Sequence, residues 1–169
     1  MSTSLLPLTA VAESFAFHDP IEGTAVRRPL VRATVTSAPL VLVVDDHEDS
    51  RIIARLVLEA AGFRVREAAN GAMGLNLATA LDPDVILLDL ILPGVDGWEV
   101  ARRLRCDPST ANIGIIAVTA LALRDDHVRA RHAGCDTVLT KPVLPKAIVE
   151  TVCRFVERPV LVAPGLFQT

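Results

Sequence analysis

The sequence predicts an α/β domain in which five parallel strands are covered by helices on both faces, a three-layer sandwich. From Leu40 onward, short apolar runs alternate five times with segments whose apolar residues recur at helical spacing. The first, third and fourth runs are apolar almost throughout, which is typical of parallel strands buried on both faces. The expected strands are LVLVV at 40–44, RVREA at 64–68, VILLD at 85–89, IGIIAV at 113–118 and TVLT at 137–140.

End signals place the helices between these strands. Asp49 and Ser50 suit the N-terminus of the first helix, and Gly62 suits a left-handed residue just past its end. Gly134 holds the equivalent position after the fourth helix, and Asp96-Gly97 begins the third. The apolar positions are Ile52, Ile53, Leu56, Val57 and Ala60 in the first helix and Ile148, Val149, Val152 and Phe155 in the last. Each helix is therefore expected to bury one face.

The chain of 169 residues is long enough for one domain with a core and short for two. Residues 39–157 carry the alternating pattern and form the predicted domain. Residues 1–38 lack a sustained period and predict a flexible leader, in which Leu30 to Val35 could pair on a sheet edge. Residues 158–169 predict a short tail, so we expect no DNA-binding or catalytic output domain.

Composition excludes several classes of protein. The hydrophobic share of 51% and the charged share of 22% are globular, and no apolar run approaches the length of a membrane helix. The net charge is −3 and the basic residues are scattered, so the sequence has no basic patch that would bind nucleic acid. The N-terminus lacks a basic region before its apolar stretch, so we expect a cytoplasmic protein. Cys106, Cys135 and Cys153 lack metal-like spacing and are expected to be buried or idle thiols.

Polar side chains of the kinds that phosphoryl chemistry can use follow four of the five strands. Asp45 and Asp46 follow the first strand, Asp89 ends the third, Thr119 follows the fourth and Lys141 follows the fifth. The carboxyl ends of parallel strands meet at one edge of a sheet, where such folds bind ligands. These five residues are therefore expected to form one site.

The chemistry of this set points to a phosphoryl group and a metal ion. Three converging carboxylates repel one another unless a hard cation neutralises them, and Mg²⁺ prefers oxygen ligands. A phosphoryl group on Asp89 would need cations and donors around its oxygens. Mg²⁺, the Lys141 ammonium and the Thr119 hydroxyl would supply them.

Four segments together resemble the motif regions of the response-regulator receiver family over about residues 39–157. They are VLVVDDHEDS, DVILLDLILPGVDGWEV, IGIIAVTALAL and AGCDTVLTKPV. The spacing also matches, since Asp89 lies 44 residues after Asp45, Thr119 lies 30 further on, and Lys141 lies 22 beyond that. The resemblance implies a flavodoxin-like, doubly wound sheet of strand order 2-1-3-4-5 with five helices.

The resemblance also implies roles for the site residues. Asp89 would be the phosphoacceptor, with Thr119 and Lys141 acting on the phosphoryl group. Asp46 would bind Mg²⁺ directly, Asp45 mainly through water, and Asp89 and the main-chain carbonyl of Ile91 would complete the protein ligands. The Lys141-Pro142 bond would be cis.

The function implied by the resemblance is that of a stand-alone receiver in a two-component phosphorelay, and not of an enzyme. It would take its phosphoryl group from a phosphohistidine on a sensor histidine kinase or a phosphotransfer protein. Output would pass to a protein partner through the surface of the fourth helix, fifth strand and fifth helix. Neither nucleic acid nor membrane is an expected partner, and a homodimer stays open.

Two positions depart from the family pattern. Most relatives have an aromatic residue three positions before the lysine and often another after the Lys-Pro pair, whereas this chain has Val138 and Val143. Signalling would then run through backbone shifts between the fourth strand and the fourth helix. The departures keep open a module of the same fold that binds partners without phosphorylation. A phosphatase of the haloacid-dehalogenase type is less favoured, because it needs an Asp where Ile91 stands.

The remaining candidate residues are expected to be solvated or to pack in the core, and not to bind a ligand. His47 adjoins the acidic pair, but imidazole prefers softer metals than Mg²⁺, so a solvated histidine is expected. His127 and His132 are five residues apart, which misses the spacing of a helical metal pair, and a solvated fourth helix is expected. Trp98 is expected to pack from the third helix against the sheet.

Overall fold

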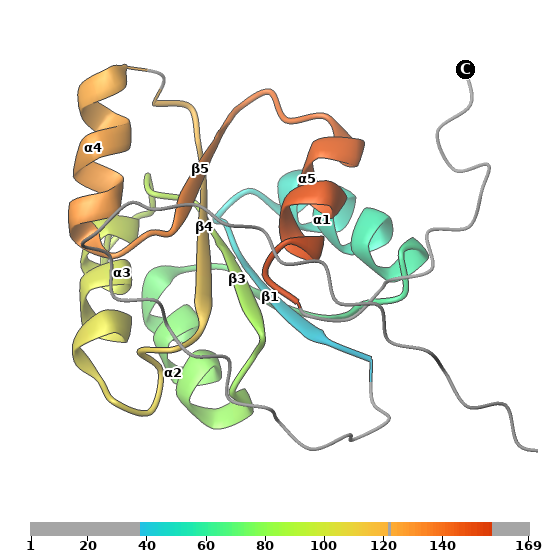
Figure 1. The fold of residues 1–169 in the computed structure, drawn as a ribbon, viewed down its shortest axis with the longest axis horizontal. Coiled ribbons are helices and arrows are strands. Elements are labelled where there is room, and N and C mark those ends of the chain that lie inside the picture. The colour runs from blue at the N-terminus through green and yellow to red at the C-terminus, as the bar shows by residue number, and fades with distance from the viewer. Residues whose placement is uncertain (1–37, 122, 157–169) are drawn as a thin grey trace, which may run out of the picture. The chain divides into compact units, whose positions relative to one another are not determined.

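The structure is a computed structural model that describes residues 38–121 and 123–156. Its described part contains five strands and five helices in strict alternation (Figure 1). The strands are β1 Leu40–Val44, β2 Arg64–Ala68, β3 Val85–Leu88, β4 Gly114–Thr119 and β5 Thr137–Thr140. The helices are α1 Glu48–Ala60, α2 Gly71–Leu81, α3 Gly97–Cys106, α4 Arg124–Ala133 and α5 Pro145–Cys153.

All neighbouring strands of the sheet are parallel, in the order β2-β1-β3-β4-β5. Helices α1 and α5 cover one face of the sheet, and α2, α3 and α4 cover the other (Figure 1). The predicted three-layer α/β fold and its strand order 2-1-3-4-5 are confirmed. The order reverses between β1 and β3, so the crevice where such folds bind ligands lies beyond the carboxyl ends of these two strands.

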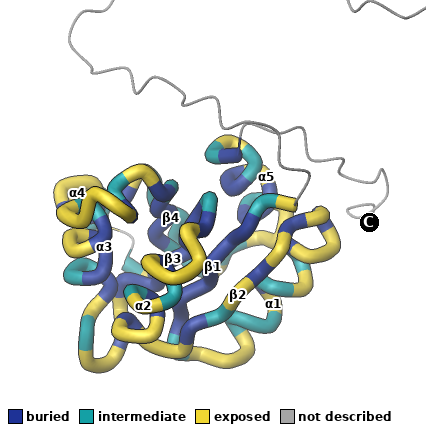
Figure 2. The backbone as a smooth tube through the Cα atoms, turned by 90° about the horizontal axis from the view of Figure 1, so that it is seen from below, coloured by how far each residue is buried: buried dark blue, intermediate teal, exposed yellow. Residues whose placement is uncertain are grey.

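The core consists of two apolar clusters, one on each face of the sheet. All residues of β1 and β3 are buried, and both strands run through the interior in Figure 2. Leu42, Ile86 and Ile115 point to the face covered by α2, α3 and α4, while Val41 and Ile116 point to the face covered by α1 and α5. Side chains of successive strand residues alternate between the two faces, so continuous apolar runs are needed to fill both clusters.

The strand predictions are confirmed for β1, β2 and β5 and shift by one residue in β3 and β4. β3 ends at Leu88. The Asp89 amide still donates to the Val44 carbonyl at 2.8 Å, and the chain then turns so that the Asp89 side chain accepts a hydrogen bond from the Ile91 amide at 2.9 Å. β4 begins at Gly114 and includes Thr119, whose carbonyl accepts a hydrogen bond from the Lys141 amide at 2.8 Å.

The helix ends follow the expected signals with one exception. Gly62 and Gly134 have positive φ angles of 88° and 111°, and the Asp96 side chain caps α3 by accepting from the Glu99 amide at 2.7 Å. The expectation that Asp49 and Ser50 begin α1 is wrong by one to two residues. His47 is the N-cap and makes no side-chain capping bond, and its amide donates to the Asp45 side chain at 2.8 Å.

Several sequence predictions fall on residues outside the described part. This group contains the predicted leader at 1–38, of which only Ala38 is described, and its candidate edge strand at 30–35. It also contains the predicted tail at 158–169. Within 38–121 and 123–156, no helix is long and apolar enough to cross a membrane. The three cysteines are free thiols; Cys135 is buried and Cys106 is exposed.

Candidate functional site

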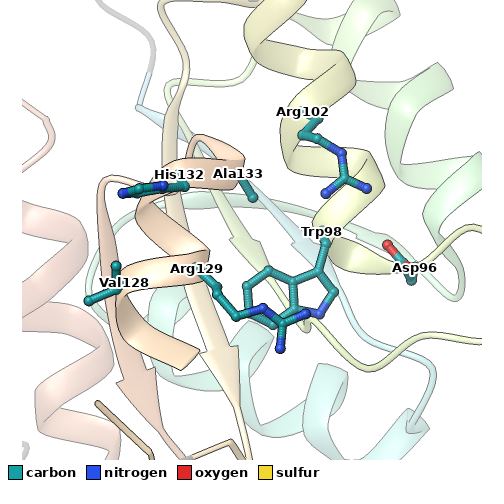
Figure 3. A pocket seen from close by; sticks show the side chains of 7 residues that line it. All are labelled: Asp96, Trp98, Arg102, Val128, Arg129, His132 and Ala133. Atoms are coloured by element: carbon teal, nitrogen blue, oxygen red, sulfur yellow. The ribbon is translucent and has the colours of Figure 1, made fainter. Parts of the chain in front are cut away.

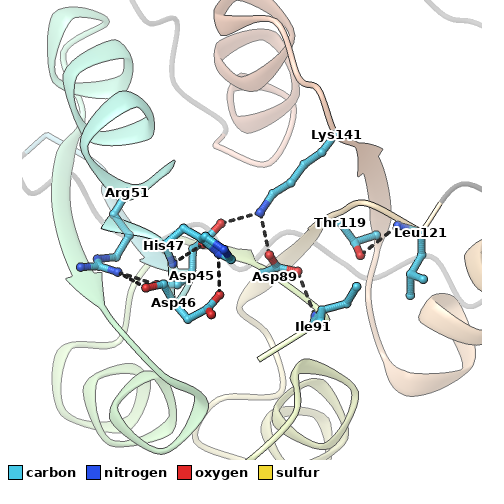
Figure 4. Close-up of polar contacts among 9 residues, drawn as sticks. All are labelled: Asp45, Asp46, His47, Arg51, Asp89, Ile91, Thr119, Leu121 and Lys141. Carbon is cyan, nitrogen blue, oxygen red and sulfur yellow. Dashed lines mark hydrogen bonds and ion pairs between the residues drawn. The ribbon is translucent and has the colours of Figure 1, made fainter. Parts of the chain in front are cut away.

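The five predicted site residues meet at the carboxyl edge of the sheet (Figure 4). Asp45 follows β1 and Asp89 follows β3, and each is only 5% exposed. Thr119 ends β4 and is 1% exposed, whereas Asp46 is half-buried. Lys141 follows β5 and reaches across β4 toward the two buried acids. The parallel topology therefore gathers residues that are far apart in the sequence.

Lys141 joins three strand ends through two short ion pairs. Its Nζ donates to Asp45 Oδ2 at 2.7 Å and to Asp89 Oδ2 at 2.6 Å. Charge-assisted hydrogen bonds of this length are about twice as strong as neutral ones. Burial by itself lowers the pKa of the Lys141 ammonium, but the hydrogen bonds to Asp45 and Asp89 outweigh burial and raise that pKa above its ordinary value. Lys141 therefore stays cationic and holds the two carboxylates together.

The backbone around Asp89 is held by the end of β1 and by the start of α3. The Asp89 amide donates to the Val44 carbonyl at 2.8 Å, and the Gly97 amide donates to the Leu90 carbonyl at 3.2 Å. A Cβ atom on Gly97 would lie 2.5 Å from the Leu90 Cα and closer still to the Asp89 carbonyl oxygen. Only glycine permits this approach, so Gly97 fixes the position of the Asp89 main chain.

The loop between β1 and α1 is fixed by two sets of hydrogen bonds. Asp45 Oδ1 accepts from the His47 amide at 2.8 Å. Arg51 Nη1 reaches back from α1 to the carbonyl of Asp45 at 2.8 Å and that of Asp46 at 3.1 Å (Figure 4). Sequence reasoning missed Arg51, because a basic residue in the first turns of a helix is normally a solvated charge. Its position five residues after Asp46 is the one signal that could have identified it.

The residues of the acidic edge fit a divalent cation. Asp46 Oδ1 is buried, and among the described residues it contacts only His47 Nδ1, at 2.9 Å, which forms an ion pair with it when the imidazole is protonated. A cation would neutralise this carboxylate without a proton on His47. Asp45, Asp46 and His47 can each present one ligand atom so that all lie within 4.8 Å of one another. Asp89 lies outside this group and is joined to Asp45 through Lys141.

Two other predicted residues adjoin the acids in different ways. The Ile91 amide points at Asp89 Oδ1, and the Ile91 side chain is 53% exposed. Thr119 Oγ1 accepts a long hydrogen bond of 3.3 Å from the Leu121 amide, so this hydroxyl is only weakly held. Ala120, directly after Thr119, is exposed. The side of the site next to β4 is therefore lined by a weakly engaged hydroxyl and a small side chain.

The two valines that replace family aromatics are both half-buried. Val138 packs against the cluster under α2, α3 and α4, and Val143 packs against the cluster under α1 and α5. Neither side chain is large enough to alternate between a buried and an exposed position as an aromatic ring does. The structure therefore agrees with the sequence in offering no aromatic switch at either position.

Away from the acidic edge, a hollow of about 340 Å³ lies between α3 and α4 (Figure 3). Trp98 forms its wall and packs against the core as expected, and the Arg129 guanidinium lies over the indole at 4.8 Å from the ring centre. His132 lines the hollow and is exposed, as predicted. The expectation of a solvated side chain is wrong for His127, which is half-buried with its Nε2 3.3 Å from Thr140 Oγ1.

Comparison with known proteins assigns the family. A parallel sheet of this order with acids, a threonine and a lysine at its strand ends defines a receiver module of signal transduction. The response regulator receiver domain model matches residues 41–153, and the chain belongs to this family. It is a receiver domain of the kind found in two-component response regulators.

Individual relatives agree with this assignment. The chain is 38% identical over 112 residues to the polar-differentiation response regulator DivK of Brucella anthropi, which covers 66% of this chain and 91% of DivK. It is 42% identical over 104 residues to the DNA-binding dual master transcriptional regulator RpaA of Synechocystis, which covers 62% of this chain and 43% of RpaA. The chain therefore spans less than half of RpaA.

The fold is also similar to solved receivers. The chemotaxis response regulator CheY4 of Vibrio cholerae superposes with a TM-score of 0.68 at 27% identity, over 71% of this chain and all of CheY4. Mg²⁺ binding and phosphoaspartate formation are typical of the receiver family.

Proposed function

We propose that this chain is a phosphorylation switch in which Asp89 accepts a phosphoryl group from a phosphohistidine. The donor would be a sensor histidine kinase or a histidine phosphotransfer protein. The observation that carries the proposal is the Lys141 bridge, which places an ammonium 2.6 Å from Asp89 and 2.7 Å from Asp45 at the carboxyl edge of the sheet. A cation preorganised in this way stabilises the charge of an incoming phosphoryl group.

The transfer exchanges one bond to phosphorus for another. A carboxylate oxygen of Asp89 forms the new P–O bond while the P–N bond to the donor imidazole breaks. The electron pair of the broken bond stays on the imidazole nitrogen, which takes up a proton. Lys141 contacts Asp89 Oδ2 already, so its Nζ is within reach of the oxygens of a phosphoryl group on that side chain.

Asp45, Asp46 and Asp89, with the main-chain carbonyl of Ile91, are the proposed magnesium ligands. When bound, Mg²⁺ neutralises the acids and the phosphoryl oxygens and orients the donor. The convergence of the Asp45 and Asp46 carboxylates supports this role, since oxygen donors are the ligands that Mg²⁺ prefers. Arg51 holds the carbonyls of Asp45 and Asp46 and so fixes the loop that carries two of the ligands.

The proposed switch begins at Thr119. Its hydroxyl would donate to a phosphoryl oxygen and give up the long contact with the Leu121 amide. The segment from β4 to α4 would then move and alter the surface of α4, β5 and α5, the proposed partner surface. Large apolar side chains exposed on or next to these helices support a protein partner, since Leu123 is 71% exposed and Leu144 is 73% exposed.

Intact-mass spectrometry tests the proposal. The full chain is incubated with Mg²⁺ and phosphoramidate, beside Asp89→Asn and the control Asp125→Asn, which alters an exposed acid of α4. We expect one phosphoryl adduct in the wild type and in the control, dependent on Mg²⁺, and none in Asp89→Asn. An adduct of equal yield in Asp89→Asn, or no adduct in the wild type while another receiver is labelled, would refute it.

The valines at 138 and 143 favour a second candidate, an interaction module that binds partners without phosphorylation. Neither side chain can report the state of Asp89 in the way an aromatic residue does. Binding to a partner would then be equal for the unphosphorylated wild type and for Asp89→Asn. A partner whose affinity changes on addition of phosphoramidate would exclude this candidate.

A further inference from the structure

His47 brings a nitrogen donor to the acidic edge of the sheet. It follows Asp46 directly and stands at the N-cap of α1 with an extended backbone, φ −83° and ψ 119°. Its Nδ1 lies 2.9 Å from Asp46 Oδ1 and 3.5 Å from Asp45 Oδ1 (Figure 4). The imidazole is therefore directed at the two acids, although its side chain is 71% exposed and has free space to turn away.

The contact between these two atoms has the length of a histidine–carboxylate ion pair, which forms when the imidazole is protonated. No other polar group of the described residues binds Asp46 Oδ1, which is buried. A cation bound between the two acids would take the place of the proton on Nδ1, because the neutral imidazole then offers its lone pair to the ion.

The separation of these two atoms matches neighbouring ligands of one metal ion. Ligands at about 2.0–2.1 Å from an ion and at right angles to each other are about 2.9 Å apart. Nδ1 of His47 and Oδ1 of Asp46 have that separation, and an oxygen of Asp45 lies within the same 4.8 Å group. The loop is also held in place, because Arg51 binds the carbonyls of both acids.

We infer that His47 is a further ligand of this metal site and makes it selective for divalent transition metals such as Mn²⁺ and Ni²⁺ over Mg²⁺. The inference rests on the proposed function, since it concerns the same site. Imidazole suits Ni²⁺ and its neighbours, whereas Mg²⁺ prefers oxygen ligands and keeps its waters. The sequence predicts a solvated His47 because Mg²⁺ is assumed to be the bound ion, and because the sequence does not show where the imidazole ring points.

Electron spin echo modulation of bound Mn²⁺ reads the coordination directly. A ligating imidazole gives ¹⁴N modulation, whereas carboxylate and water ligands do not. The full chain with Mn²⁺ is compared with His47→Gln and with the control His132→Gln, which alters an exposed histidine of α4. We expect ¹⁴N modulation in the wild type and the control, and its loss in His47→Gln while Mn²⁺ remains bound.

Titration calorimetry with Ni²⁺ and with Mg²⁺ measures how the site discriminates between the two ions. Loss of even an outer-shell partner costs about 10–100-fold in metal affinity, so His47→Gln should weaken Ni²⁺ binding by at least about tenfold. Mg²⁺ binding should change by less than about twofold, because Mg²⁺ keeps water where imidazole would bind. His132→Gln should leave both affinities as they are.

The outcomes separate this inference from the proposed function. Mn²⁺ bound without ¹⁴N modulation in the wild type, or equal Ni²⁺ binding in the wild type and His47→Gln, overturns the role of His47 and leaves the acidic site standing. If Asp46→Asn binds Mn²⁺ and Mg²⁺ as tightly as the wild type does, the acidic metal site itself fails, and the inference fails with it.

Discussion

Replacing Lys141 by methionine tests the central feature of the site. Methionine keeps an unbranched apolar side chain of comparable length but removes the ammonium that binds Asp45 at 2.7 Å and Asp89 at 2.6 Å. Two carboxylates that are each 5% exposed would then face each other without a neutralising group. The free energy of unfolding should therefore fall, and phosphorylation of Asp89 should slow.

The expected loss follows from the two hydrogen bonds. Hydrogen bonds to charged groups contribute about 1.5–3 kcal/mol each, so two contribute about 3–6 kcal/mol. The Lys141 side chain is 26% exposed, so water screens part of this interaction. We expect a loss of about 2–4 kcal/mol at neutral pH without Mg²⁺. Added Mg²⁺ should recover part of the loss, because it neutralises the same acids.

The pH dependence has a defined sign. The pKa of Lys141 is raised in the folded state above the ordinary value of 10.5. The stabilisation is therefore fully present below pH 10.5 and is lost as the pH rises through the raised value. The difference in stability between wild type and Lys141→Met should be constant around neutral pH and should shrink at alkaline pH.

Urea denaturation followed by Trp98 fluorescence measures both effects. The chain has one other lysine, Lys146, whose side chain is 62% exposed and whose nearest acid, Glu150, is 3.7 Å away. Lys146→Met is the matched control and should change stability by less than about 0.5 kcal/mol. A loss below about 1 kcal/mol in Lys141→Met, or a difference that does not shrink above about pH 11, would refute the reasoning.

Three further predictions follow from other contacts. Gly97→Ala should lower the unfolding free energy in urea by about 2 kcal/mol or more, because its Cβ would meet the backbone of Asp89 and Leu90; a neutral effect would contradict the close approach. Arg51→Met should weaken Mg²⁺ binding in calorimetry by about tenfold, and unchanged affinity would show that the loop needs no support from α1. Burial raises the pKa of the Cys135 thiol to about 12, so a disulfide reagent at neutral pH should label exposed Cys106 quickly and Cys135 only on unfolding. Rapid labelling of both thiols in the folded chain would contradict the burial of Cys135.

Most of the sheet could be predicted because its signals are local. Residues 40–44 and 85–88 must fill both faces of the sheet, which forces a run of apolar residues that is visible without a structure. The ends of β3 and β4 differ from the prediction by one residue, because they depend on single hydrogen bonds. The chain turns after Asp89, whose side chain accepts from the Ile91 amide, and Thr119 stays in its strand through the bond from the Lys141 amide.

The start of α1 shows why capping residues alone are a weak guide. Asp49 is a favourable capping residue and lies near the helix start, but the chain begins the helix at Glu48. The Asp45 side chain accepts the amide of His47 and so forms the turn that leads into the helix. Because this bond joins the end of β1 to the start of α1, the preference of Asp49 for a capping position could not reveal it.

The sequence alone determines that Asp45, Asp89, Thr119 and Lys141 lie at one edge of the sheet, because each stands at the end of a predicted parallel strand. Parallel strands present their carboxyl ends to the same side, so strand-end residues converge whatever the details of packing. How the converging groups are paired was decided by the tertiary structure. The Lys141 bridge, the reach of Arg51, the approach of Gly97 to Asp89 and the direction of His47 depend on distances across separate elements. Periodicity and spacing carry no such distances, because they describe one element at a time.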